Sequence, residues 1–127
     1  MSTGNEATVR VRSGPLVGPV LGRVVGMLAA RAQCPIDRLD DAMLLTDAVA
    51  AHAPRHARDG HVVVFVATDD DGIELRVTGL SSGGARRMLD ESELPGVGNV
   101  FERIADEIRP ATVGDADELA LRLSFRG

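Results

Sequence analysis

The chain opens with a short stretch in which apolar and polar residues alternate. Val9 and Val11 are interleaved with polar side chains, and a Ser-Gly-Pro turn signal follows at 13–15. A period of two is typical of a half-buried strand, so we predict a strand at 8–12. Residues 1–6 are small and polar, and we predict that they are disordered.

Two helical segments are predicted next. In the first, at about 18–32, apolar residues recur at the spacing of one helix face: Val17, Val20, Leu21, Val24 and Leu28. Pro19 fits a helix only in its first turn, which puts the helix start near Gly18. The second helix follows Pro35, has a broad apolar surface, and is ended or kinked by Pro54.

The middle of the chain predicts a β-hairpin. The run HVVVFVAT at 61–68 is rich in β-branched residues, as buried strands are. The turn sequence DDDG follows at 69–72, and 73–78 then alternates between apolar and polar residues. We therefore expect 61–68 to pair with 73–78 in an antiparallel hairpin.

The last third combines a long loop, a helix and a strand. The loop at 79–96 begins with glycine and serine and includes a short helical turn at about 85–89. Apolar residues at helical spacing predict a helix at 97–108, which Pro110 ends. Alternating leucines at 119–125 predict the final strand.

This order of elements predicts a two-layer α/β sandwich. Its sheet is expected to be mixed and mainly antiparallel, with three helices on one face. The 127 residues suit one domain, and we assign 1–127 to a single unit.

Composition excludes several classes of function. The net charge is −5 and aromatic residues make up only 2%, so the chain lacks the basic face and the stacking platforms that nucleic-acid binding requires. Cys34 is the only cysteine, which rules out an internal disulfide. No segment resembles a signal peptide or a membrane span, so we predict a cytoplasmic protein with no membrane partner. His52 and His56 have the spacing of a helical ligand pair, but the intervening proline argues against a metal site.

Three blocks of sequence carry a resemblance to a known family. They are LLTDAVAAHA at 44–53, IELRVTGLSSG at 73–83, and PGVGNVF at 95–101, where the third predicted helix begins. Together with the order of elements, they resemble the GHKL ATPases of the Bergerat fold. Within that superfamily, the chain is most similar to the small bacterial anti-sigma factors that double as serine kinases. The resemblance covers roughly 8–125.

The first block implies a damaged catalytic centre. The family has a Glu that polarises the attacking hydroxyl or water, and four residues later an Asn that holds magnesium. Asp47 stands at the Glu position and Ala51 at the Asn position. Alanine offers no oxygen to a metal, so Asp47 is a degenerate general-base position and we expect no metal ligand here. The plain alternative is that Asp47 is a solvated or capping acid.

The other two blocks imply a damaged nucleotide site. In the family pattern D-x-G-x-G the Asp accepts the adenine amino group. Gly79 replaces that Asp, and Gly83 matches the last Gly. The third block retains the G-x-G that opens a helix, as Gly96 and Gly98 followed by Asn99, and phosphates would rest on its backbone amides. The alternative for these glycines is a purely local role in loops and turns. The degenerate ATP site thus comprises Ala51, Gly79, Gly83, Gly96, Gly98 and Asn99.

The resemblance implies a regulatory protein that binds a sigma factor, a STAS-type anti-anti-sigma partner, or both, and that often forms homodimers. We expect no cofactor, with ATP and magnesium binding weak at most. The alternative is an active ATP- and magnesium-dependent serine kinase acting on a STAS partner. We further predict that the segment 80–95 collapses inward through Met88 and Leu89. The partner surface is expected to include four arginines of the first strand and first helix, Arg10, Arg12, Arg23 and Arg31.

Overall fold

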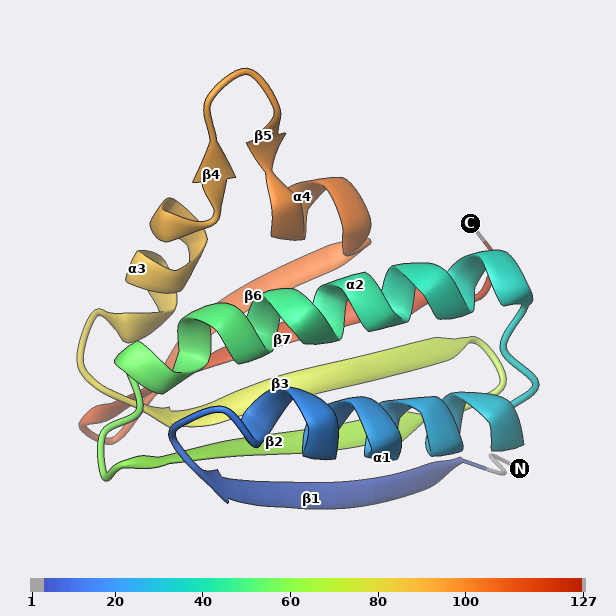
Figure 1. Ribbon diagram of the computed structural model, residues 1–127, viewed down its shortest axis with the longest axis horizontal. Helices are drawn as coiled ribbons and strands as arrows, with labels where there is room; N and C mark the ends of the chain where they lie inside the picture. The colour runs from blue at the N-terminus through green and yellow to red at the C-terminus, as the bar shows by residue number, and fades with distance from the viewer. Residues whose placement is uncertain (1–3, 127) are drawn as a thin grey trace.

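An antiparallel sheet of five strands forms one layer of the protein (Figure 1). The computed structural model describes residues 4–126. Within that range the strand order is β1-β2-β3-β7-β6, and every pair is antiparallel, so the sheet is not mixed. The strands are β1 (Asn5–Arg12), β2 (His61–Thr68), β3 (Gly72–Leu80), β6 (Glu107–Val113) and β7 (Ala116–Ser124).

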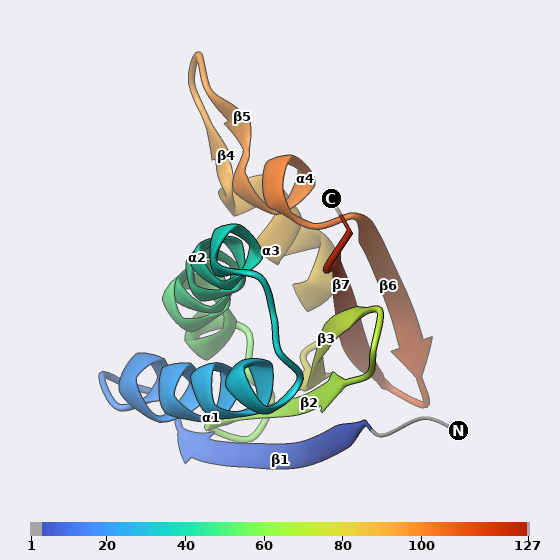
Figure 2. The same ribbon diagram turned by 90° about the vertical axis from the view of Figure 1, so that its right-hand side faces the viewer.

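Helices form the second layer and cover one face of this sheet (Figure 2). The described residues include four α-helices where three were predicted, together with one 3-10 turn. They are α1 (Val17–Arg31), α2 (Ile36–His52), η1 (Ala53–Arg55), α3 (Gly84–Glu91) and α4 (Val100–Ile104). Between α3 and α4 a small ribbon, β4 (Glu93–Leu94) with β5 (Gly98–Asn99), projects away from the sheet. The two-layer α/β architecture is therefore confirmed.

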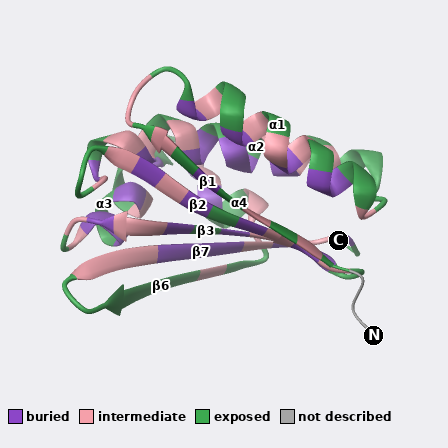
Figure 3. Ribbon diagram, turned by 90° about the horizontal axis from the view of Figure 1, so that it is seen from below, coloured by how far each residue is buried: buried purple, intermediate pink, exposed green. Residues whose placement is uncertain are grey.

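The core lies between the helices and the inward side of the sheet. Along β2 buried and more exposed residues alternate, as the colour bands in Figure 3 show, whereas the middle of β7 is buried on both faces at Leu119, Ala120 and Leu121. Leu75 and Leu121 lie opposite each other in the β3–β7 pair, and each is at most 1% exposed. Leu21 of α1 and Leu45 of α2 close the core from the helix side, and both are fully buried. The core consists almost wholly of aliphatic side chains, as the low aromatic content requires.

The predicted hairpin is confirmed with its turn. β2 pairs with β3 from Val63–Thr78 to Thr68–Ile73. The side chain of Asp69 accepts hydrogen bonds from the backbone N–H groups of Asp71 at 2.8 Å and Gly72 at 2.9 Å. A carboxylate that bonds its own turn in this way stabilises the tight reversal.

The helix predicted at 97–108 is wrong for most of its length. Only Val100–Ile104 is helical, and Ala105 is already extended. Ile108 and Pro110 belong to β6, where they lie opposite Leu121 and Leu119 of β7. An edge strand tolerates proline because one side of its backbone needs no partner. The helical spacing of apolar residues therefore arose by chance from a short helix followed by a strand.

The N-terminal prediction is wrong where the structure can test it. Asn5 and Glu6 belong to β1 and pair with Thr68 and Ala67 of β2. Residues 1–3 lie outside the described part of the chain. The short helical turn predicted in the long loop is confirmed as α3, and it extends over eight residues.

Two glycine substitutions are expected to have opposite effects on stability. A Cβ at Gly72 would lie 2.4 Å from the carbonyl oxygen of Leu123, which is backbone and cannot rotate away. Gly72→Ala should therefore destabilise the fold by about 1–3 kcal/mol. At Gly26, inside α1, an added Cβ would meet no atom within 4 Å, so Gly26→Ala should stabilise by about 0.5–1 kcal/mol. Urea unfolding of both variants tests the pair, and a Gly72→Ala protein as stable as the wild type would contradict the close approach of β3 and β7.

Candidate functional site

Asp47 and Ala51 lie on the outer face of α2. Both residues are exposed, and Leu44, one turn before Asp47, is 53% exposed. The opposite face of α2 buries Leu45 and Val49 against the sheet. The side chain of Asp47 makes no hydrogen bond or ion pair with a described residue, so nothing orients its carboxylate for proton transfer.

Gly79 and Gly83 are each required by the local backbone. Gly79 has φ of +64° and lies where the β3–β7 register shifts, between Val77 and Leu80. Its carbonyl accepts the N–H of Arg58 at 2.9 Å. Gly83 has φ of +79°, precedes α3, and donates its N–H to the carboxylate of Asp117 at 3.1 Å. Because left-handed backbone favours glycine, these contacts give both residues a structural role.

Asn99 caps the helix that follows the third block. Gly96 and Gly98 have positive φ; Gly96 lies in the turn between β4 and β5, and Gly98 is the first residue of β5 and pairs with Leu94. The Asn99 side-chain oxygen accepts the backbone N–H groups of Phe101 at 2.9 Å and Glu102 at 3.2 Å. The first N–H groups of α4 are thus bonded by the chain itself.

The same Asn99 joins α4 to α3. Its side-chain nitrogen donates to the carbonyl of Leu89 near the end of α3, and Asn99 is only 7% exposed. Nearby, the Ser92 carbonyl accepts the N–H of Val100 at 3.3 Å. One amide side chain therefore satisfies groups on both helices and holds the ends of the β4–β5 ribbon together.

Helix α3 packs onto the core beneath it. Met88 is fully buried and Ala85 is 2% exposed, whereas Leu89 is only partly buried against the core. Gly84 at the start of α3 lies against the side chains of His56 and Leu80, where a Cβ would approach to 3.2 Å. The inward collapse predicted for this segment is confirmed for Met88 and is partial for Leu89.

Two histidines and a glutamate meet where α3 contacts the end of α2. His56 Nε2 is hydrogen-bonded to Glu91 Oε2 at 2.8 Å, and His52 Nδ1 lies 3.9 Å from the same oxygen. That nitrogen of His52 is buried and has no hydrogen-bond partner among the described residues. The His52 ring also meets Phe101 edge-on, with centroids 6.3 Å apart. The sequence spacing singled out the two histidines as a possible ligand pair. It did not predict Glu91 as their neighbour, because Glu91 lies 35 residues beyond His56.

The environment of this cluster shifts the pKa values of His52 and Glu91. Burial lowers the pKa of His52 below its ordinary value of 6.5, and the neighbouring Glu91 only partly offsets that effect. The hydrogen bond from His56 lowers the pKa of Glu91. No three histidine, cysteine, aspartate or glutamate side chains in the described range gather as metal ligands.

The depressed pKa of His52 predicts a loss of stability on mild acidification. Below about pH 6.5 the unfolded chain takes up a proton at His52 that the folded chain resists, so the free energy of unfolding should fall. Glu91 adds a further loss only at lower pH, because its stabilising effect persists until the pH falls through its lowered pKa. His52→Leu should therefore flatten the stability profile between about pH 7 and pH 5, measured by urea unfolding. Equal slopes in the wild-type protein and in His52→Leu would contradict the assignment.

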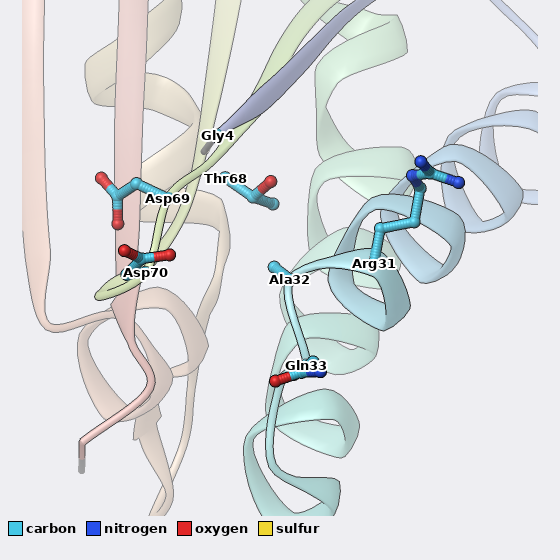
Figure 4. Close-up of a pocket in the computed structure, with 7 residues that line it drawn as sticks. All are labelled: Gly4, Arg31, Ala32, Gln33, Thr68, Asp69 and Asp70. Carbon is cyan, nitrogen blue, oxygen red and sulfur yellow. The ribbon is translucent and has the colours of Figure 1, made fainter. Parts of the chain in front are cut away.

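A polar depression lies at the opposite end of the domain, between the end of α1 and the β2–β3 turn (Figure 4). Arg31 and Gln33 line one side, and Asp69 and Asp70 line the other. Partial burial raises the pKa of Asp69, but hydrogen bonds from the Asp71 backbone and from Arg122 outweigh it and leave that pKa lowered. Asp69 is thus committed to the turn, and the depression presents no cluster of groups that would select a ligand.

Each α-helix of residues 4–126 is too short or too polar to span a bilayer. Comparison of the chain with models of known protein families and with curated protein sequences gives no match.

Proposed function

We propose that this protein is a bacterial regulatory protein of the anti-sigma type that acts by binding other proteins and does not use a nucleotide. Its partner would be a sigma factor, a STAS-type anti-anti-sigma protein, or both. The proposal rests on the sequence resemblance, with which the two-layer α/β fold is compatible.

The observation that carries the nucleotide-independent part is the capping role of Asn99. In the resembled family, phosphates rest on backbone amides where a G-x-G opens this helix; here the next N–H groups along the helix start, those of Phe101 and Glu102, are bonded to Asn99. A nucleotide would have to displace a side chain that also bonds Leu89. Breaking such a buried contact typically costs about 1–3 kcal/mol.

The neighbouring positions support the same view. Ala51 is exposed on α2 and has no oxygen to offer a metal. Gly79 has no side chain to accept an adenine amino group, and its left-handed backbone would strain most replacements. Met88 is buried beneath α3, so that helix already packs on the protein's own core.

The arginines predicted to meet the partner do not share one surface. Arg10 and Arg12 alternate with Val9, which is buried beneath the helices, so they point to the open face of the sheet. Arg23 and Arg31 lie on α1, on the other side of β1. None of the four forms an ion pair with a described residue. A partner with acidic side chains would therefore meet one pair or the other.

Calorimetry with magnesium-ATP tests the first part of the proposal. The wild-type protein should give no measurable binding below about 1 mM nucleotide, because two polar contacts of the site are missing. The double variant Ala51→Asn with Gly79→Asp restores both residue types and should bind more tightly if the alignment is correct. A micromolar dissociation constant for the wild-type chain would refute nucleotide independence.

Binding to purified partners tests the second part. Sigma factors and STAS proteins from one bacterium would be titrated against the immobilised chain, with and without magnesium-ATP. The expected result is binding to at least one of them that does not change when nucleotide is added. Transfer of phosphate to a serine of the STAS protein would instead support the kinase alternative, and no binding to either class would reject the anti-sigma assignment.

A further inference from the structure

Strand β2 carries apolar side chains on both of its faces. Its even-numbered valines are buried beneath the helices. The odd-numbered residues between them point to the open face of the sheet. These are Val63, Phe65 and Ala67, which we call the β2 stripe. A strand that is apolar on both faces is typical of a sheet covered on both faces. In the described range the helices lie on one face only (Figure 2), and Phe65 is 45% exposed.

The two strands beside β2 are polar on this face. The register places Thr8 of β1 and Arg76 of β3 on either side of Phe65, and Arg10 of β1 beside Val63. Every residue of β1 and β3 that lies opposite the β2 stripe is charged or a threonine. The apolar surface is therefore a narrow band with polar borders, which suits a partner with an apolar band of its own.

The unpaired charge beside the β2 stripe is mainly positive and lies on β1. Arg10 and Arg12 are exposed, and neither forms an ion pair with a described residue. On the β3 side Arg76 is neutralised by Glu74 at 3.2 Å. Glu6 lies at the far end of β1, four residues before Arg10. A complementary partner must therefore bring acidic side chains to the end of β1 that carries the two arginines.

We propose that the open face of β1 and β2 binds an amphipathic helix of a partner protein, with its apolar side on the β2 stripe and its acidic residues over Arg10 and Arg12. The inference rests on the protein-binding function proposed above, and it names the surface and the chemistry of the partner segment. It also selects between the two pairs of arginines. The pair on β1 borders the β2 stripe, whereas Arg23 and Arg31 lie on α1, in the other layer.

A helix fits this surface in shape and in length. The face of a sheet is normally covered by helices or by another sheet. From Glu6 to Arg12, strand β1 spans about 20 Å, which equals about 14 residues of helix. An amphipathic helix of this length places an apolar residue every three or four positions along one side. That side can follow the β2 stripe while acidic residues at its border reach β1.

Single-stranded nucleic acid is the other class of ligand that binds sheets through exposed aromatic rings and arginines. Here Phe65 is the one exposed phenylalanine, since Phe101 and Phe125 are buried, and the sequence has no Trp or Tyr. A nucleic-acid strand brings a charge with every nucleotide, which a chain of net charge −5 opposes. A protein helix can carry acidic residues only where Arg10 and Arg12 lie. The surface therefore suits a protein segment better.

A synthetic amphipathic peptide tests the surface without a natural partner. The probe is a fluorescent helix of about 18 residues, with Leu along one side and Glu at its border. Fluorescence anisotropy should give a dissociation constant of about 10–100 μM for the wild-type chain, in about 0.1 M salt. The same peptide with Gln in place of Glu should bind at least about tenfold more weakly. No binding of the Glu peptide, or equal binding of the two peptides, would overturn the proposal.

Two matched charge reversals locate the binding. Arg10→Glu combined with Arg12→Glu should weaken binding of the Glu peptide about tenfold or more. Arg23→Glu combined with Arg31→Glu changes the net charge equally but lies on α1, so the affinity should stay within about twofold of the wild-type value. Circular dichroism would confirm that both variants are folded. Equal effects of the two reversals, or a larger effect of the α1 pair, would overturn the assignment to the open face.

Replacing the exposed ring tests the apolar part of the surface. Phe65→Ala should weaken binding of the Glu peptide about fivefold. Met27→Ala is the matched control, because Met27 is 57% exposed but lies on α1, and it should leave the affinity unchanged. Undiminished binding to Phe65→Ala would reject the β2 stripe as the docking site. Binding of labelled oligothymidylate to the wild-type chain, with its loss in Phe65→Ala, would assign this face to nucleic acid and overturn the proposal.

The charge-reversal variants also separate this inference from the function on which it rests. They would be titrated with the purified sigma factors and STAS proteins described above. A partner that binds the wild-type chain should bind the Arg10→Glu and Arg12→Glu double variant at least about tenfold more weakly. Undiminished binding to that variant would overturn the surface and leave the proposed function intact. Binding of the Glu peptide but of neither protein class would reject the anti-sigma function and leave the surface intact.

Discussion

Replacing Phe101 by alanine is expected to lower the free energy of unfolding by about 3–5 kcal/mol. Phe101 is completely buried and is among the largest side chains in the core. It belongs to α4, which has five residues and is too short to be stable without tertiary contacts. Its contact with the His52 ring joins α4 to the end of α2. Removing the ring therefore leaves a cavity and also detaches the helix from its support.

The sequence supplies a matched control for this substitution. Phe65 is 45% exposed on the open face of the sheet. Because its ring is already partly in water, Phe65→Ala should cost less than about 1.5 kcal/mol. Urea unfolding of both variants measures the difference. Losses of similar size would show that α4 is not held to the core through Phe101.

Replacing Met88 by alanine is expected to cost about 2–5 kcal/mol. Met88 is the fully buried side chain of α3, and Ser92 bonds its carbonyl through both its backbone N–H and its hydroxyl. The cavity would lie directly beneath α3. Part of the loss should therefore appear as local opening, with faster amide exchange at 84–99 than in the strands.

Leu94→Ala is the control for Met88, since Leu94 is 46% exposed on β4 of the same segment. Its effect should stay within about 0.5 kcal/mol. Hydrogen exchange followed by mass spectrometry locates the opening in both variants. Uniform destabilisation across the whole chain by Met88→Ala, with no preference for α3, would contradict a locally closed segment.

The buried side chains of Met88 and Phe101 hold the segment between β3 and β6 against the core. Met88 secures α3 and Phe101 secures α4, while Asn99 bonds groups on both. The hydrogen bond between His56 and Glu91 adds a polar contact to the end of α2. A regulator that does not bind nucleotide would need such contacts within its own chain to order this segment, which supports the function we propose.

Local sequence determined the elements whose signals do not depend on distant residues. The β2–β3 hairpin follows from a continuous β-branched run, a DDDG turn and a clean alternation, and Asp69 closes it with bonds to its own backbone. α1 follows from helical spacing with Pro19 confined to the first turn. The collapse of Met88 could also be predicted, because an apolar side chain in a polar segment gains from burial wherever a core is within reach.

Only the tertiary structure decided the remaining features, because their partners are far apart in sequence. β6 forms because it pairs with β7, which places Ile108 opposite Leu121 and Pro110 opposite Leu119. This pairing outweighs the helical spacing of the apolar residues in that segment. Asn99 looked like the residue after a phosphate-binding turn, yet its cap on Phe101 and its bond to Leu89 require α3 to be in place. Glu91 joins the two histidines for the same reason: its hydrogen bond to His56 spans 35 residues and exists only once α3 packs against the segment that follows α2.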